Sequence, residues 1–157
     1  MEPNIGLDPE FRNRAIEILQ RQLADHFVLA AKVRNYHWNV EGSSFNDLHK
    51  FFEGLYDQLD AAIDGLAERI RALGGKSPGT LTEFQQLTRL KEYPAFYPGW
   101  HDMVQDLLKW TEAISTNLRE EIPHLNDQYK DFVTGDYFTG LLAAHEKNAW
   151  MLRSLLA

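Results

Sequence analysis

Residues 36–75 read YHWNVEGSSFNDLHKFFEGLYDQLDAAIDGLAERIRALGG, and this stretch decides the fold. Apolar residues recur in it at steps of three and four, at Leu48, Phe52, Leu55, Leu59, Ile63, Leu66, Ile70 and Leu73. This spacing predicts an amphipathic helix from Ser44 to Leu73. Histidines and carboxylates accompany the apolar stripe, at His37, His49, Glu53, Asp57, Asp60, Asp64 and Glu68.

Two pairs in this helix have a spacing that suits metal ligands. His49 and Glu53 are four residues apart, as are Asp64 and Glu68, so the members of each pair share a face. A rise of ~1.5 Å per residue separates His49 from Glu68 by roughly 28 Å, whereas a metal holds its ligands at about 2 Å. One helix cannot join the pairs, but two copies packed antiparallel about a two-fold axis can. An acidic face that only contacts solvent is the open alternative.

The residue types around these pairs resemble the signature of the Dps family, the mini-ferritins named as DNA-binding proteins from starved cells. The signature runs through His37-Trp38-Asn39-Val40-x-Gly42-x-x-Phe45-x-x-Leu48-His49, Phe52-Glu53, Leu55-Tyr56-Asp57 and Asp64-x-x-Ala67-Glu68-Arg69-Ile70. A later string resembles the last helix of that family, His145-Glu146-Lys147-x-x-Trp150-Met151-Leu152-Arg153. The resemblance extends over nearly the whole chain, from about Leu19 to Leu156.

The resemblance implies a ferroxidase centre that lies between two subunits. Its ligands would be His37, His49 and Glu53 of one subunit, together with Asp64 and Glu68 of the two-fold mate. Many members of the family carry Asp where this chain has Glu53. The longer side chain can shift the metal or change its coordination.

Further residues near this centre have both a functional and a structural interpretation. Trp38 is expected to pack, and the resemblance adds a role in trapping oxidants. Asp57 and Asp60 are either outer acceptors for the ligand histidines or solvated carboxylates. The resemblance also places acidic residues at a three-fold pore, although turn and cap roles explain them equally well; these are Asp127, Asp131 and Asp136.

The whole chain, residues 1–157, is expected to form one all-α domain, a ferritin-like four-helix bundle preceded by a loose tail at residues 1–7. The expected helices run from Asp8 to about Trp38, from Ser44 to Leu73, from near Trp100 to about Pro123, and from about Asp136 to Leu156. Asn126–Asp136 is expected to be a connection. A long crossover between the two middle helices is typical of ferritin-like bundles. A short helix is expected within it over residues 82–88, with Thr82-x-x-Gln85 as its start.

Glu121-x-x-His124 has the spacing of the di-iron motif found inside single ferritin-like bundles. The chain has no second copy of that motif, and Pro123 interrupts this one. A chance match at a solvated helix end is therefore the expected interpretation, which disfavours a rubrerythrin-like or bacterioferritin-like site within one chain. His26 is expected to pack or to form a hydrogen bond, and His101 and His145 have no identifiable partner.

The composition favours a protein that handles cations. The 157 residues include 16 basic and 23 acidic residues, a net charge of −7, which disfavours nucleic acid as the main partner. The absence of cysteine excludes disulfides, thiolate metal sites and cysteine nucleophiles. No signal-peptide pattern and no stretch of ~20 apolar residues occurs, so a cytoplasmic protein without membrane contact is expected.

The expected function is iron storage and detoxification. Histidine and carboxylate ligands without sulfur suit Fe²⁺, with Zn²⁺ or Mn²⁺ as competitors. The resemblance implies oxidation of Fe²⁺, mostly by hydrogen peroxide, and storage of the ferric mineral in a hollow dodecamer built from dimers. DNA binding is expected to be weak or absent, because the chain shows no lysine cluster near its ends. The alternative is a structural or DNA-condensing helical oligomer without ferroxidase activity.

Overall fold

The computed structural model describes residues 2–157, which form five α-helices and one π-helical turn and contain no strand. The elements are α1 Pro9–Asn39, α2 Phe45–Ala72, α3 Leu81–Leu87, α4 Trp100–Pro123, η1 His124–Gln128 and α5 Phe132–Leu155. The expected all-α bundle, with a short extra helix in the crossover, is confirmed. Met1, part of the expected tail, lies outside the described residues.

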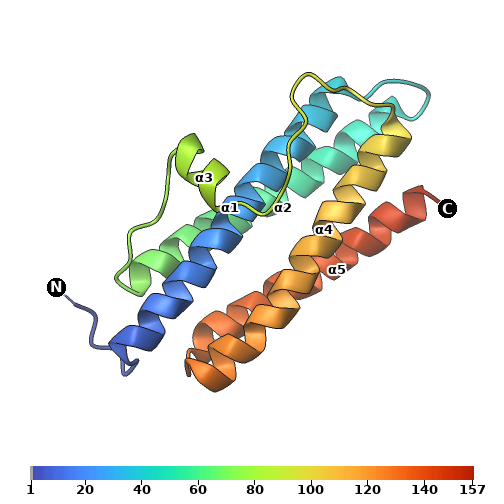
Figure 1. The fold of residues 1–157 in the computed structure, drawn as a ribbon. Helices are drawn as coiled ribbons and strands as arrows, with labels where there is room; N and C mark the ends of the chain where they lie inside the picture. Colours follow the sequence, from blue (N-terminus) through green and yellow to red (C-terminus); the bar gives the residue numbers. More distant parts are fainter. Residues whose placement is uncertain (1) are drawn as a thin grey trace.

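The four long helices form two antiparallel hairpins that pack against each other (Figure 1). The first hairpin is α1 with α2, and the second is α4 with α5. The crossover from α2 to α4 runs along α1 and carries α3, which packs on α1. The turn between α1 and α2 and the start of α4 lie at one end of the bundle, and the turn between α4 and α5 lies at the other.

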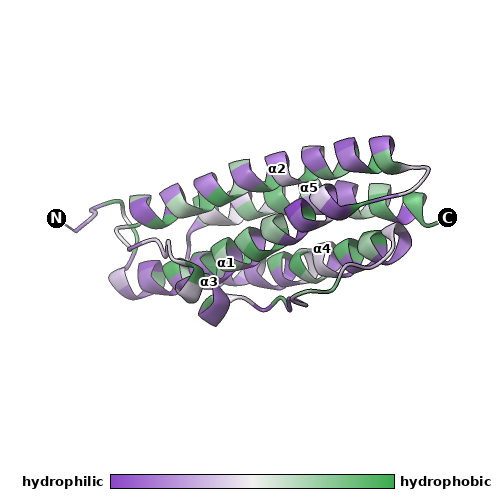
Figure 2. Ribbon diagram, turned by 90° about the horizontal axis from the view of Figure 1, so that it is seen from above, coloured by the Kyte–Doolittle hydropathy of each residue, from purple (hydrophilic) through white to green (hydrophobic). Residues whose placement is uncertain are grey.

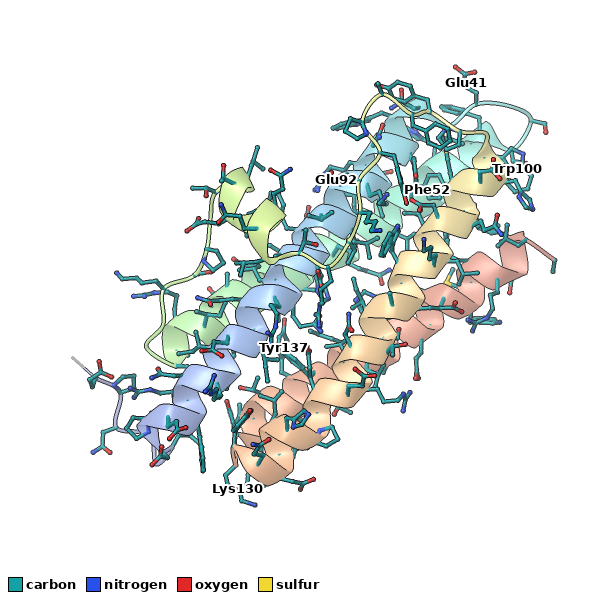
Figure 3. All side chains as sticks on the ribbon, in the orientation of Figure 1. Glu41, Phe52, Glu92, Trp100, Lys130 and Tyr137 are labelled. Carbon is teal, nitrogen blue, oxygen red and sulfur yellow. The ribbon has the colours of Figure 1, made fainter. Side chains whose placement is uncertain are left out.

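The core is formed by one apolar side of each long helix, and the polar sides face outward (Figure 2). Burying one large aliphatic or aromatic side chain contributes ~1.5–3 kcal/mol, so the apolar stripes hold the hairpins together. Phe52 and Tyr137, labelled in Figure 3, come from opposite hairpins. Phe52 is fully buried, and the hydroxyl of Tyr137 donates to the carbonyl of Ala62 across the hairpin interface at 3.2 Å.

The helix starts differ in how they are capped. Asp8, the predicted start of the first helix, caps α1, because its carboxylate accepts from the N–H of Glu10 at 2.8 Å. Ser44, the predicted start of the second helix, is the N-cap residue of α2, but its side chain forms no capping hydrogen bond, since its backbone (φ −96°, ψ 13°) has left the extended region from which a side chain reaches the first turn. In the crossover, Thr80 and Glu83 form the capping box, so the start expected at Thr82 is two residues late.

The helix α2 ends at Ala72 with Leu73 as its C-cap, in agreement with the predicted end at Leu73, and Gly74 follows. Gly74 has a φ of +86°, a left-handed conformation that side chains disfavour. Its N–H donates to the carbonyl of Arg71 at 2.9 Å, and the N–H of Gly75 donates to the carbonyl of Ile70 at 3.0 Å. This pair of bonds closes the helix and turns the chain into the crossover.

The connection before α5 is shorter than expected. Pro123 is the last residue of α4, and the chain continues through the π-helical turn η1 instead of opening into a loop. Proline lacks an N–H and crowds the carbonyl four residues earlier, so a wider turn follows it. The helix α5 then begins at Phe132 rather than at Asp136, because Asp131 caps it by accepting from the N–H of Thr134 at 3.1 Å.

Among residues 2–157, every helix is too short or too polar to span a lipid bilayer.

Candidate metal centre

The turn between α1 and α2 places the two predicted histidine ligands face to face. The rings of His37 and His49 stack with centroids 3.7 Å apart and planes inclined by 20°. The Nδ1–H of His37 donates to the carbonyl oxygen of His49 at 2.7 Å, and the Nδ1–H of His49 donates to the carbonyl oxygen of His37 at 2.9 Å. A carbonyl oxygen can only accept, so each neutral ring carries its proton on Nδ1. Both Nε2 lone pairs are therefore free for a metal.

A short turn makes this approach possible. The chain leaves α1 at Val40 in an extended conformation, and Gly42 has a φ of +108°. Because only glycine adopts this conformation at low cost, Gly42 lets the chain reverse within a few residues. Its carbonyl then accepts from the N–H of Phe45 at 3.1 Å, where α2 begins.

Aromatic rings flank the histidine pair on both sides. The ring of Phe45 lies 5.1 Å from that of His49, and the ring of Tyr56 lies 5.2 Å from that of His37. We call Phe45, His49, His37 and Tyr56 the ring column. His37 is buried and His49 is half-buried, so the column lies at the edge of the core and reaches the surface of the hairpin.

The predicted carboxylate ligands do not join the histidines within one chain. Glu53, Asp64 and Glu68 are all exposed on α2. Among residues 2–157, no group of three or more His, Cys, Asp or Glu side chains is arranged to hold a metal ion. One chain therefore offers two imidazole nitrogens at one end of α2 and an acid pair further along. The nitrogen and oxygen donors, without sulfur, suit Fe²⁺ as a substrate and also suit Zn²⁺ or Mn²⁺.

The histidine N–H groups and Asp60, one of the two proposed outer partners, have other contacts. Both Nδ1–H groups donate to main-chain carbonyls, and Asp60 forms an ion pair with Arg34. Asp57 is exposed. Trp38 is 70% exposed directly after His37, so within one chain most of its ring is not packed.

The three acidic residues considered for a pore have different surroundings. Asp131 is only 2% exposed, and its carboxylate accepts from Arg69 at 2.9 Å while it caps α5. The cap role considered for this residue is therefore observed. Asp127 and Asp136 are exposed. A pore that they line remains a prediction.

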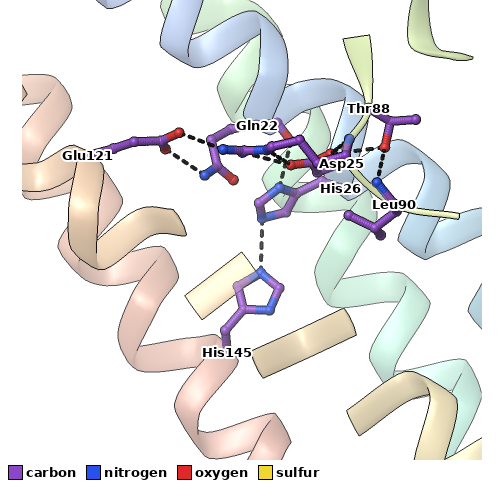
Figure 4. Close-up of polar contacts among 8 residues, drawn as sticks. Gln22, Asp25, His26, Thr88, Leu90, Glu121 and His145 are labelled. Atoms are coloured by element: carbon purple, nitrogen blue, oxygen red, sulfur yellow. Dashed lines mark hydrogen bonds and ion pairs between the residues drawn. The ribbon is translucent and has the colours of Figure 1, made fainter. Parts of the chain in front are cut away.

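A buried polar cluster in the bundle centre corrects the interpretation of Glu121 (Figure 4). Its carboxylate accepts from Gln22 at 2.6 Å and from Arg89 at 2.9 Å, so Glu121 is not a solvated residue. Arg89 also pairs with Asp25 at 2.7 Å and fastens the crossover to α1. The side chain of His124 instead forms a hydrogen bond with that of Gln128 at 3.0 Å, so Glu121 and His124 have different partners and do not act as a motif.

The same cluster gives His26 and His145 a partner in each other. The Nε2 atoms of the two rings lie 3.0 Å apart, and the Nδ1–H of His26 donates to the carbonyl of Gln22 at 2.8 Å. Burial lowers the pKa of His26 to about 4 and the pKa of His145 to about 3, so both are neutral at pH 7. The signal in the sequence was their position in the apolar stripes of α1 and α5, where a polar residue needs a buried partner.

Comparison with known proteins gives a consistent result. Residues 16–157 match the family model described as a ferritin-like domain. The chain is 38% identical to DNA protection during starvation protein 2 of Bacillus anthracis, over 91% of this chain and 97% of the relative. It is 41% identical to an uncharacterised low temperature-induced protein of Nostoc, over 98% of this chain and 86% of the relative.

A solved structure supports the same fold. The Dps protein of Vibrio cholerae O1 superposes with a TM-score of 0.93 at 28% identity, over 99% of this chain and 97% of the other. That protein is described as a member of a broad superfamily of ferritin-like diiron-carboxylate proteins. The four long helices and their crossover thus have a close counterpart.

Proposed function

Because this chain belongs to the Dps family of ferritin-like proteins, we propose that it oxidises Fe²⁺, stores the ferric product and protects against oxidative damage. The observation that carries the proposal is the reciprocal pair of hydrogen bonds between His37 and His49. These bonds fix the tautomer of both rings with Nε2 free, which is the state a metal ligand requires.

The proposed site is shared between two copies of the chain. His37, His49 and Glu53 of one copy face Asp64 and Glu68 of the other across a two-fold axis. Two features support this: the acid pair is exposed, and residues 2–157 of one chain contain no complete ligand set. Symmetry then gives two equivalent sites in each dimer.

In the proposed reaction, Fe²⁺ is the substrate and hydrogen peroxide the oxidant. The imidazoles bind the ion as neutral donors, and the carboxylates offset its positive charge. Two Fe²⁺ ions supply two electrons to one peroxide, and two protons are taken up to give two Fe³⁺ and two waters. Because both electrons arrive together, no hydroxyl radical is released.

The protein is proposed to act as a homo-oligomer in the cytoplasm, a dimer that builds a hollow dodecamer around the ferric mineral. A net charge of −7 for each chain supports attraction of Fe²⁺ to such a shell. The same charge supports weak or absent DNA binding, although the related Bacillus anthracis protein is named for DNA protection. Zn²⁺ and Mn²⁺ are proposed to compete with Fe²⁺ at the site.

The double variant His37→Ala/His49→Ala tests the proposal. Fe²⁺ oxidation by hydrogen peroxide, followed by the absorbance of ferric product, is expected to fall at least ~100-fold, because removal of both nitrogen donors leaves only carboxylates. The variant His101→Ala is the control, since His101 is exposed at the start of α4. Equal rates in the double variant and the wild type would favour a structural or DNA-condensing oligomer instead.

A further inference from the structure

Tyr56 and Arg34 are built against the proposed metal site, although neither belongs to its ligand set. The ring of Tyr56 meets the imidazole of His37 edge-on, with centroids 5.2 Å apart and planes at 85°. The guanidinium of Arg34 lies over the ring of Tyr56, 4.5 Å from its centroid. Arg34 of α1 also forms an ion pair with Asp60 of α2, which holds the guanidinium over the ring.

The hydrogen bond of His37 does not by itself fix the direction of Nε2. A single bond from Nδ1 to a carbonyl lets the imidazole plane tilt about the axis of that bond. The stacked ring of His49 restrains one face of His37. Tyr56 contacts His37 from a perpendicular direction and so restrains the tilt that the stack permits.

We propose that Tyr56, held by Arg34 and Asp60, is a positioning residue that fixes the imidazole plane of His37 and thereby sets the metal affinity of the site. The identity of the metal in this inference rests on the proposed function. The contacts of Tyr56 with His37 and Arg34 are independent of it.

Co²⁺ binding to the assembled protein tests this inference, with the visible absorption of the bound ion as the readout. Co²⁺ accepts the same nitrogen and oxygen ligands, and its spectrum reports their geometry. Loss of an outer partner of a ligand histidine weakens metal binding by 10–100-fold. We therefore expect Tyr56→Leu to weaken Co²⁺ binding by about tenfold or more and to change the spectrum, whereas Tyr56→Phe keeps both.

Tyr129→Leu is the matched control for loss of a half-buried ring. The ring centroids of Tyr129 and Phe11 lie 6.0 Å apart, and Phe11 is at the start of α1, whereas the ring column is at its end. If Tyr56→Leu keeps the wild-type Co²⁺ affinity and spectrum, the positioning role is overturned. It is also overturned if Tyr129→Leu loses as much Co²⁺ affinity as Tyr56→Leu does. His37→Ala separates the two proposals. If His37→Ala binds Co²⁺ as the wild type does, the proposed metal site and this inference both fail. If His37→Ala loses Co²⁺ binding while Tyr56→Leu binds Co²⁺ as the wild type does, only this inference fails.

Discussion

At the scale of single residues, the two histidine pairs differ in which ring nitrogens carry the protons. In the pair of His37 and His49, both protons point at main-chain carbonyls and both Nε2 atoms are free. In the pair of His26 and His145, the Nε2 atoms face each other in the core, where one must donate and the other accept. The first pair can bind a cation, whereas in the second the Nε2 of His26 accepts from the Nε2–H of His145, because the Nδ1–H of His26 already donates to Gln22.

The second pair predicts that the protein loses stability in mild acid. Both histidines have an ordinary pKa of 6.5 when unfolded, and their pKa values in the fold are about 4 and about 3. As the pH falls below 6.5, the unfolded chain takes up these protons and the folded chain does not. Each histidine then lowers the free energy of unfolding by about 1.4 kcal/mol per pH unit, until the pH reaches its folded value. Above pH 6.5 neither the folded nor the unfolded chain takes up these protons, so the two histidines do not make the free energy of unfolding depend on pH.

Thermal unfolding between pH 7 and pH 5 measures this effect. The variant His26→Leu/His145→Leu is expected to show a smaller fall in Tm over this range than the wild type. His101→Gln, which changes an exposed histidine, is the control and should keep the wild-type slope. An unchanged slope in the double variant would show that other groups cause the acid sensitivity.

At the scale of helices, the ends decide where each functional side chain lies. Gly42 lets α2 return beside α1, which brings His49 onto His37. Gly74 ends α2 and starts the crossover that reaches the far side of α1. Both glycines have a positive φ, a backbone conformation that other residues adopt only with strain.

Gly74→Ala is expected to destabilise the protein by ~1–2 kcal/mol, through strain at a positive φ and through the close approach of Pro3. Chemical unfolding at pH 7 measures this change. Gly79→Ala in the same crossover is the matched control, because a Cβ at Gly79 meets nothing within 4 Å and no positive φ is required. Equal stabilities of the two variants would contradict the role assigned to the helix end.

At the scale of the whole molecule, the metal site is proposed to need two copies of the chain. His49, which stacks on His37 of α1, lies near the start of α2, and the acid pair lies far from it along that helix. Residues 2–157 of one chain contain no complete set of ligands. A mutation in either pair would therefore damage both sites of a symmetric dimer. Two differently mutated chains can nevertheless rebuild one intact site when they pair.

Mixing His37→Ala/His49→Ala chains with Asp64→Asn/Glu68→Gln chains tests this architecture. Each parent assembly is expected to be inactive in Fe²⁺ oxidation. After unfolding, mixing in equal amounts and refolding, half of the dimers contain one chain of each kind and have one intact site out of two. The mixture should therefore recover about a quarter of the wild-type activity. If the site lay within one chain, the mixture would stay as inactive as its parents.

The sequence by itself determined the four amphipathic helices, the long crossover and the residue types of the proposed centre, because helical periodicity and glycine or proline signals are local. Only the tertiary structure decided that His37 and His49 fix each other's tautomer, that Tyr56 packs against His37, and that Glu121 joins a buried cluster. These contacts connect residues from different helices, and their hydrogen bonds exist only after the helices pack. The sequence alone misplaces the start of α5 for the same reason, because Asp131 caps this helix from a buried position in which it pairs with Arg69 of α2.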